Sequence, residues 1–113
     1  MSSLPEDCLF CTLVREGDHV RAADGFVAIR DINPQAEVHL LVLPERHVDS
    51  FRDVGAFPAE ESGRMLTFVA DTARDAGLDD YRVIVNVGPS AGQTVYHLHW
   101  HILGGRLGRM IGP

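Results

Sequence analysis

The sequence predicts an α+β fold in which a five-stranded antiparallel sheet is combined with one long helix and a short N-terminal helix. Apolar runs of strand length recur along the chain between short turns, whereas helical periodicity extends over only one long segment. A parallel sheet would need more crossover helices than the chain contains. The 113 residues, 45% of them hydrophobic, predict a single domain over residues 1–113 with one hydrophobic core.

Three of the expected strands lie in the first half of the chain. Residues 20–23 and 26–30 are expected strands, and the Asp24-Gly25 pair between them is typical of a two-residue hairpin turn. Residues 39–43 (HLLVL) form a nearly continuous apolar run, which predicts a central strand.

Two helices are expected. Residues 8–15 (CLFCTLVR) predict a knuckle that leads into a short helix. The long helix is expected over residues 58–76, with Pro58 at its first position and Gly77 as its C-terminal stop. Its apolar side chains recur at helical spacing and predict one buried face: Met65, Phe68, Val69, Thr72, Ala73 and Ala76.

The last two strands are expected over residues 81–87 (YRVIVNV) and 95–103. Residues 88–92 (GPSAG) form the loop between them. Gly104 and Gly105 are expected to end the last strand.

The charge of the chain disfavours two classes of partner. Ten basic residues stand against sixteen acidic ones, for a net charge of −6. Binding to long nucleic acid or to an anionic membrane needs a basic surface, so neither partner is expected. No apolar run approaches the ~20 residues that cross a bilayer, and the first residues lack the basic character of a secretory signal. We therefore expect a cytoplasmic protein.

Three histidines, His97, His99 and His101, alternate with apolar residues in the expected strand 95–103. Because successive strand residues point to opposite faces, the three imidazoles would share one face, with neighbours roughly 6.5–7 Å apart. Imidazole titrates at about pH 6.5, so one neutral ring can attack phosphorus while another protonates a leaving group. A three-histidine metal site is the alternative interpretation of this spacing.

The loop before these histidines is suited to holding an anion. Gly88 and Gly92 permit backbone N–H groups to approach a phosphate, and Gln93 and Thr94 add side-chain donors. Glycine-rich loops are common in hairpins, so this hypothesis depends on the adjoining histidines. Neutral donors would also explain how an acidic protein holds an anionic substrate.

Cys8 and Cys11 have the two-residue spacing of half a tetrahedral zinc site. His47, after the expected strand 39–43, and His97 are candidates for the other two ligands. A zinc ion with four protein ligands would be structural rather than catalytic. Two packed thiols are the alternative. A disulfide is disfavoured in the cytoplasm, and a thioredoxin-like redox pair would need a strand before it.

Three segments resemble the histidine-triad (HIT) superfamily: residues 31–36 (DINPQA), 39–47 (HLLVLPERH) and, most specifically, 92–104 (GQTVYHLHWHILG). The resemblance extends from about Asp7 to Arg106 and is greatest to the Hint branch of purine nucleoside phosphoramidases. It implies a HIT-like fold and a homodimer. It also implies hydrolysis of nucleoside 5′-monophosphoramidates, or related acyl-nucleotides, through a nucleotidyl-histidine intermediate.

The resemblance also implies residue roles. His99 would be the nucleophile, His101 would contact the phosphate and the leaving group, and His39 would orient the nucleophile. Asp31 would hold the ribose hydroxyls of a purine nucleotide. The phosphate would be bound by Asn86, Gln93, Thr94 and Val95, and the base by Phe10, Leu13, Ile29 and Ile32. Bacterial members with this cysteine pair bind zinc through the positions that match Cys8, Cys11, His47 and His97.

The sequence departs from the family pattern at three places, one of which is the segment between Phe10 and Ile29, shorter than in animal Hint proteins. Trp100 stands where a smaller aliphatic residue is usual, and residues 107–113 lack the Trp-Pro-Pro-Gly tail of the animal Hint proteins. That tail reaches the partner subunit's active site, so substrate preference stays open. The alternatives are a dinucleoside polyphosphate hydrolase of the Fhit kind, a nucleotidyl transferase, and a non-catalytic, zinc-stabilised nucleotide-binding module.

Overall fold

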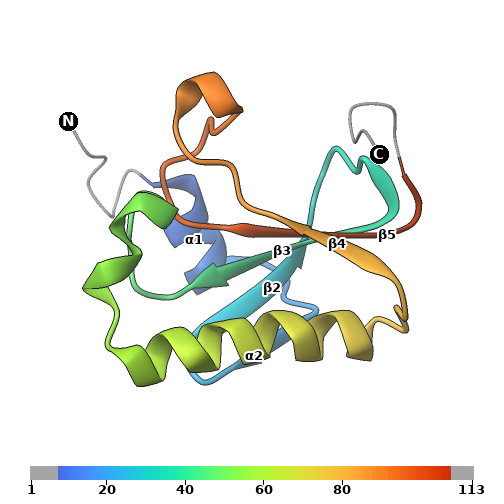
Figure 1. The fold of residues 1–113 in the computed structure, drawn as a ribbon, viewed down its shortest axis with the longest axis horizontal. Helices are drawn as coiled ribbons and strands as arrows, with labels where there is room; N and C mark the ends of the chain where they lie inside the picture. Colours follow the sequence, from blue (N-terminus) through green and yellow to red (C-terminus); the bar gives the residue numbers. More distant parts are fainter. Residues whose placement is uncertain (1–7, 108–113) are drawn as a thin grey trace.

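The computed structural model describes residues 8–107, and Figure 1 shows their arrangement. Residues 108–113, which hold most of the departing C-terminal segment, lie outside the described residues. The helices are α1 (Leu9–Glu16) and α2 (Ala59–Asp75), with short 3₁₀ helices η2 (Phe51–Ala56) and η3 (Pro89–Ala91). The strands are β1 (Arg21–Ala23), β2 (Phe26–Arg30), β3 (Ala36–Pro44), β4 (Tyr81–Ile84) and β5 (Trp100–Leu107).

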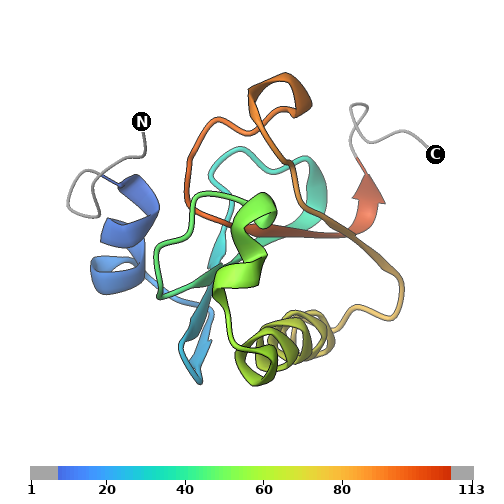
Figure 2. The ribbon, with the colours of Figure 1, turned by 60° about the vertical axis from the view of Figure 1, so that its left-hand side comes forward.

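The five strands form one antiparallel sheet in the order β1-β2-β3-β5-β4. Helices α1 and α2 lie on opposite faces of this sheet, as Figure 2 shows. The predicted α+β class, with one long helix and a short N-terminal one, is confirmed. Within residues 8–107, no helix is both long enough and apolar enough to span a membrane.

The two faces of the sheet bury different sets of side chains. On the α2 face, Phe26, Leu40 and Ile102 pack against Met65 and Phe68 of the helix, in a cluster that includes Trp100. On the α1 face, a smaller cluster contains Cys8, Phe10, Cys11, Val27, Ile29, Leu41 and Leu43. Because strand residues alternate between faces, one set packs in the core under α2. The other set lies on the α1 face, where the candidate site is.

The hairpin turn between β1 and β2 is confirmed. Asp24 and Gly25 have φ angles of 56° and 90°, so both lie in the left-handed region. A two-residue turn of this kind matches the right-handed twist of the strands it joins, and glycine adopts the required φ without a steric penalty.

The bounds of several elements differ from those predicted. Helix α2 begins at Ala59, and Pro58 is its N-cap rather than its first residue. Strand β3 begins earlier, at Ala36, and β4 ends at Ile84 rather than at residue 87. Strand β1 begins at Arg21 rather than at residue 20.

The largest difference concerns the last strand, which was expected over 95–103 but extends from Trp100 to Leu107. Before Trp100 the chain leaves the sheet, since the N–H of Leu98 donates to the carbonyl oxygen of Val48 at 2.7 Å. At its other end the strand continues through two glycines. A Cβ on Gly104 would lie 2.5 Å from Leu78, so glycine there permits close packing rather than ending the strand.

Candidate functional site

The three alternating histidines divide between two neighbouring sites on the α1 face. His97 is fully buried, and its Nδ1 lies 3.5 and 3.4 Å from the sulfur atoms of Cys8 and Cys11. His99 and His101 lie side by side, with ring centroids 5.1 Å apart. The prediction that all three histidines lie in one strand is therefore wrong, because His97 and His99 precede β5 and only His101 lies in it.

A hydrogen-bond relay sets the proton positions on His39 and His101. The backbone N–H of Gln35 donates to Nδ1 of His39 at 3.0 Å, so that nitrogen carries no proton. The neutral ring carries its proton on Nε2, which lies 2.9 Å from Nδ1 of His101. His101 therefore accepts through Nδ1 and carries its own proton on Nε2. Among the residues that the structure describes, this buried Nε2 has no hydrogen-bond partner.

His99 has the complementary arrangement. Its Nδ1 lies 2.7 Å from the carbonyl oxygen of His97, which can only accept, so Nδ1 carries the proton and Nε2 has a lone pair. The ring of Phe10 packs edge-on against His99, with centroids 4.9 Å apart. A free imidazole lone pair and an imidazole N–H donor thus lie next to each other, as a nucleophile and a proton donor would.

Burial keeps these three imidazoles neutral. Desolvation, followed by the neighbouring rings of His99 and His39, lowers the pKa of His101 to about 4. Desolvation also lowers the pKa of His99 and of His39, although the Asp31 carboxylate opposes the change at both rings. At neutral pH the lone pair of His99 is therefore available for attack.

Asp31 lies just after β2, beside this relay. Its Oδ1 accepts the N–H of Asn33 at 2.8 Å, and its Oδ2 lies 3.4 Å from Nε2 of His39. A carboxylate has about four acceptor positions, so Asp31 retains capacity for hydroxyl donors.

Gln93 holds the loop together instead of offering side-chain donors to an anion. Its Nε2 donates to the carbonyl oxygens of Asp49 at 2.7 Å and Val95 at 3.1 Å, and its Oε1 accepts the N–H of Gly88 at 3.0 Å. Both amide hydrogens are used, and the residue is only 2% exposed. The prediction of Gln93 as a side-chain phosphate donor is therefore wrong.

Asn86 and Thr94 are the other predicted side-chain donors of this segment. Thr94 is exposed. The Asn86 amide faces Gly92, where an added Cβ would lie 3.8 Å from Nδ2. Gly92 has a φ of 98°, a conformation that side-chain-bearing residues rarely adopt.

Three of the four predicted base-slot residues belong to the apolar cluster on the α1 face, and one of them, Phe10, contacts His99. Phe10 and Ile29 are buried in the α1-face cluster, and Leu13 packs against it. Val95, predicted to lie at the phosphate, packs against the same cluster. Ile32 is 92% exposed and belongs to neither core cluster.

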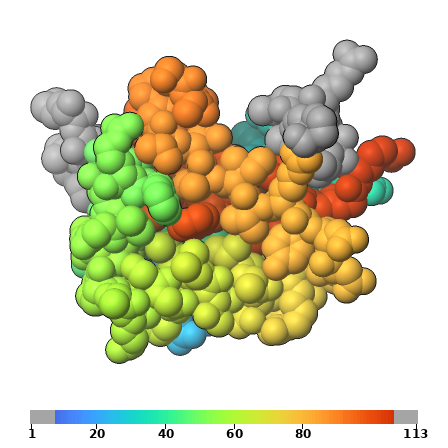
Figure 3. Space-filling view, in the orientation of Figure 1, coloured from blue at the N-terminus to red at the C-terminus, as the bar shows by residue number. Residues whose placement is uncertain are grey.

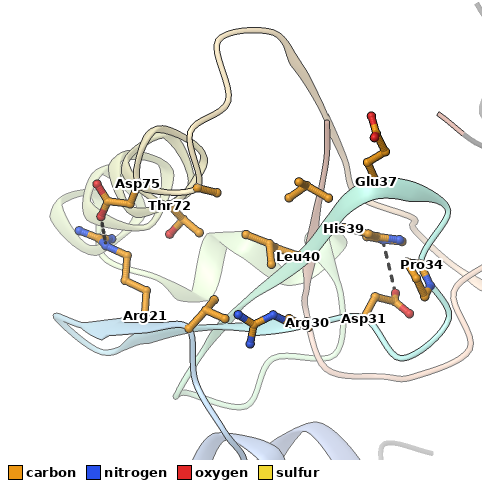
Figure 4. A pocket seen from close by; sticks show the side chains of 12 residues that line it. Arg21, Arg30, Asp31, Pro34, Glu37, His39, Leu40, Thr72 and Asp75 are labelled. Atoms are coloured by element: carbon orange, nitrogen blue, oxygen red, sulfur yellow. Dashed lines mark ion pairs between the residues drawn. The ribbon is translucent and has the colours of Figure 1, made fainter. Parts of the chain in front are cut away.

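A cavity of about 510 Å³ lies between the C-terminal part of α2 and strands β1 to β3 (Figure 4). Asp31 and His39 reach its margin, but His99 and His101 are not among the residues that line it. The space next to the candidate nucleophile is therefore distinct from this cavity.

A second cluster contains Cys8, Cys11, His47 and His97, whose ligand atoms all lie within 4.8 Å of one another. Cys11 Sγ lies 3.2 Å from Nδ1 of His47 and 3.4 Å from Nδ1 of His97. Cys8 is the N-cap of α1, and its Sγ accepts the N–H of Cys11 at 3.3 Å. The first turn of α1 thereby holds the sulfur atoms of Cys8 and Cys11 close together, facing the two histidines.

The proton positions on the two histidines suit metal binding. Nε2 of His47 donates to the Asp49 carboxylate at 2.9 Å, and Nε2 of His97 donates to the carbonyl oxygen of Pro44 at 2.8 Å. Both Nδ1 lone pairs therefore face the cysteines. Metal-ligating histidines usually have such outer partners, and two cysteines with two histidines are a tetrahedral zinc set. The residues present fit a zinc ion.

Asp31, His39 and His101 also bring their ligand atoms within 4.8 Å of one another. A metal ion on Nε2 of His39 would displace the proton to Nδ1, where the N–H of Gln35 already donates. The hydrogen bonds from Gln35 to His39 and from His39 to His101 therefore oppose metal binding by these three residues.

Two residues that shape these sites were not predicted from the sequence. Gln35 acts through its backbone N–H, which no side-chain pattern reveals. Asp49 follows His47 by two residues, and this spacing could have identified it as a partner of a metal-binding histidine. His39, expected to orient His99, is instead hydrogen-bonded to His101.

Comparisons with known proteins agree with this arrangement. The family model described as "HIT domain" matches residues 13–108. The purine nucleoside phosphoramidase of Escherichia coli (strain K12) is 40% identical over 114 residues, covering 96% of this chain and 96% of that protein. An uncharacterized HIT-like protein of Synechococcus elongatus is 40% identical over 107 residues, covering 91% and 94% respectively.

Solved structures of the same family superpose closely. A HIT family hydrolase from Clostridium thermocellum has a TM-score of 0.83 and 34% identity, covering 98% of this chain and 97% of that one. A HIT family hydrolase from Legionella pneumophila has a TM-score of 0.82 and 37% identity, covering 94% and 97% respectively.

Proposed function

This chain belongs to the HIT domain family, and we propose that it is a hydrolase of purine nucleoside 5′-monophosphoramidates that acts through a nucleotidyl-histidine intermediate. The observation that carries the proposal is the opposite protonation of two adjacent rings. His99 has a lone pair on Nε2, and His101 has a buried, unpartnered N–H on Nε2. A leaving group or phosphate oxygen would supply the missing acceptor.

In the first step, Nε2 of His99 attacks phosphorus and the P–N bond of the substrate breaks. The leaving nitrogen takes up a proton from solvent and departs as a neutral amine, while the Nε2–H of His101 donates a hydrogen bond to it, so that His101 stays neutral. The carbonyl oxygen of His97 accepts the Nδ1 hydrogen of His99, and so stabilises the positive charge that develops on that ring.

In the second step, a water molecule attacks phosphorus and loses one proton to solvent, while the Nε2–H of His101 donates a hydrogen bond to a phosphate oxygen. The bond between phosphorus and His99 breaks, and the nucleoside monophosphate is released. Both rings then have their starting protonation, so the cycle balances without a cofactor in the chemistry.

The remaining roles concern the nucleotide. We assign the ribose hydroxyls to Asp31, whose carboxylate retains acceptor positions. The side chains of Asn86 and Thr94 and the backbone N–H groups of Thr94 and Val95 would hold the phosphate. We assign the base to Phe10, Leu13 and Ile29 of the α1-face cluster and to the exposed Ile32.

We also propose a zinc ion at Cys8, Cys11, His47 and His97. With four protein ligands it would be structural, joining α1 to the segment after β3 and to the residues before β5.

We propose further that residues 1–113 form one domain and that two copies pair through β4. This strand is an edge of the sheet, and its Tyr81 and Val83 are 39% and 42% exposed. An unpaired edge with exposed apolar residues suits strand addition by a second copy. Measurement of the mass in solution tests this assignment.

The test of the function is to mix the protein with adenosine 5′-phosphoramidate and quench at short times. We expect AMP as the product and a transient AMP adduct on a peptide that contains His99. His99→Ala should lose turnover by at least ~10³-fold while retaining AMP binding, since covalent catalysis disappears. His19→Ala is the control, because His19 lies outside both clusters and contacts the carbonyl oxygen of Leu13. Near-normal turnover by His99→Ala would contradict the proposal.

A further inference from the structure

We propose that Asp49 is a positioning residue that couples the cysteine-histidine cluster to the loop at 88–94. Its carboxylate accepts a hydrogen bond from Nε2 of His47 at 2.9 Å, and its carbonyl oxygen accepts one from Nε2 of Gln93 at 2.7 Å. One residue thus holds a candidate metal ligand through its side chain and the loop through its backbone. The inference rests on the metal site and nucleotide site proposed above.

The loop end of this connection is Gln93. Its Oε1 accepts the N–H of Gly88 at 3.0 Å, and its own backbone N–H donates to the carbonyl oxygen of Gly88 at 3.0 Å. Gln93 therefore closes the loop from both sides. If Asp49 moves and its hydrogen bond to Gln93 breaks, the Gln93 side chain loses one of the contacts that fix its position in the loop.

A second contact follows the same path. The residue before Asp49, Val48, accepts the N–H of Leu98 at 2.7 Å, and Leu98 directly precedes His99. Figures 1 and 3 show the green segment that contains Asp49 beside the orange loop that contains Gln93. The segment after β3 thus touches the cluster, the loop and the residues before the nucleophile.

The metal end depends on the carboxylate. The His47 side chain is 14% exposed, so loss of its acceptor would leave a largely buried N–H without a partner. The ring would then be free to turn its Nδ1 away from Cys11. A metal ion on Nδ1 would hold the ring, and through it Asp49, in the position that supports Gln93. Metal binding and loop order should therefore strengthen each other by the same factor, because such coupling is reciprocal.

Amide hydrogen exchange tests the coupling without using turnover or a nucleotide. In the wild-type protein, saturating zinc should slow exchange at the Gly88 and Gln93 amides several-fold relative to the metal-free protein. Asp49→Ala should lose most of this zinc-dependent protection. Asp49→Asn keeps an oxygen that can accept from His47, so it should retain most of it. Asp53→Ala is the matched control, since the Asp53 side chain is exposed and has no hydrogen bond or ion pair among residues 8–107.

Zinc affinity, measured by competition with a coloured chelator, is the second readout. Asp49→Ala should bind zinc roughly 10–100-fold more weakly, the usual effect of losing an outer-shell partner, and Asp49→Asn should lose less. Unchanged zinc affinity together with unchanged protection in Asp49→Ala would overturn the proposal, and so would a wild-type protein that binds no zinc. If Asp49→Ala fails to fold, Asp49→Leu carries the test, since it also removes the acceptor of the His47 N–H, and zinc affinity and protection equal to those of the wild type would overturn the proposal. If the protein does not hydrolyse phosphoramidates, the expected amide exchange and zinc affinity stay the same, because neither measurement uses a nucleotide.

Discussion

Nε2 of His39 lies 2.9 Å from Nδ1 of His101, and this contact determines which nitrogen of His101 carries a proton. In the β3–β5 ladder His39 is opposite Leu103 and Leu41 is opposite His101, so the two histidines are diagonal neighbours on one face. A slip of one residue would place one ring on the opposite face of the sheet. The register of β3 against β5 therefore determines which nitrogen of His101 carries the proton.

The first prediction concerns this contact. His39→Ala should lower kcat for a phosphoramidate by about 10²-fold with little change in KM, because the N–H of His101 is no longer fixed on Nε2, where it faces the leaving nitrogen. A nucleotide ester with an acidic phenol as leaving group needs less protonation and should lose much less. Steady-state kinetics on the two substrates measure the difference. Equal losses on both substrates would contradict the assigned role.

The second prediction concerns stability and pH. The folded protein lowers the pKa of His101 from an ordinary value of 6.5 to about 4, so between these values the unfolded chain binds the extra proton. The free energy of unfolding should therefore decrease as pH falls from 6.5 to 4, with at most about 3 kcal/mol from this ring.

Denaturant unfolding of metal-free wild-type protein and His101→Gln at several pH values measures this contribution. The variant lacks the titrating ring, so its stability should decrease less over the same interval. Parallel curves for the two proteins would show that His101 does not contribute.

Much of the fold follows from local sequence signals. Asp24-Gly25 predicted a two-residue turn because both positions need positive φ, and their φ angles of 56° and 90° agree. The apolar face of α2 followed from its helical spacing, and Met65 and Phe68 are buried as expected, whereas Ala76, also predicted on this face, is exposed at the helix end.

Local sequence patterns gave wrong predictions where hydrogen bonds to residues distant in sequence determine the course of the backbone. Alternation of His97, His99 and His101 indicates a strand, but the contacts that bend the chain come from Pro44 and Val48. Side-chain periodicity carries no information about these backbone partners. Gln93 was misassigned for the same reason, since the carbonyl oxygen of Asp49 that occupies its amide lies 44 residues away in sequence.

The third prediction is that the metal site stabilises the fold and is separable from the chemistry. The protein should contain about one zinc ion per chain, and Cys8→Ser should lower zinc content and Tm more than it lowers the rate per folded molecule. Metal analysis, thermal unfolding and an active-site-normalised rate measure the three quantities. A metal-free protein of unchanged stability would contradict a structural zinc ion. Chelation that abolished activity in a folded protein would indicate a catalytic one.

The fourth prediction concerns the substrate. Adenosine or guanosine phosphoramidates should have a higher kcat/KM than diadenosine polyphosphates on the same preparation. In the proposed site, Phe10, Leu13 and Ile29 would hold one purine, and Asp31 would hold one ribose. The predicted phosphate donors Asn86 and Thr94 are neutral, whereas a long polyphosphate chain would favour a run of basic residues.

The leaving group gives the second part of the reason. An amine leaves a P–N bond readily only when its nitrogen is protonated, and the unpartnered Nε2–H of His101 is available to stabilise the leaving nitrogen by a hydrogen bond. A polyphosphate leaving group is already stable as an anion and needs this proton less. His101→Gln should therefore reduce turnover of the phosphoramidate more than that of the polyphosphate. A higher kcat/KM for the polyphosphate in the wild-type protein would instead favour a dinucleoside polyphosphate hydrolase that uses the same nucleophile.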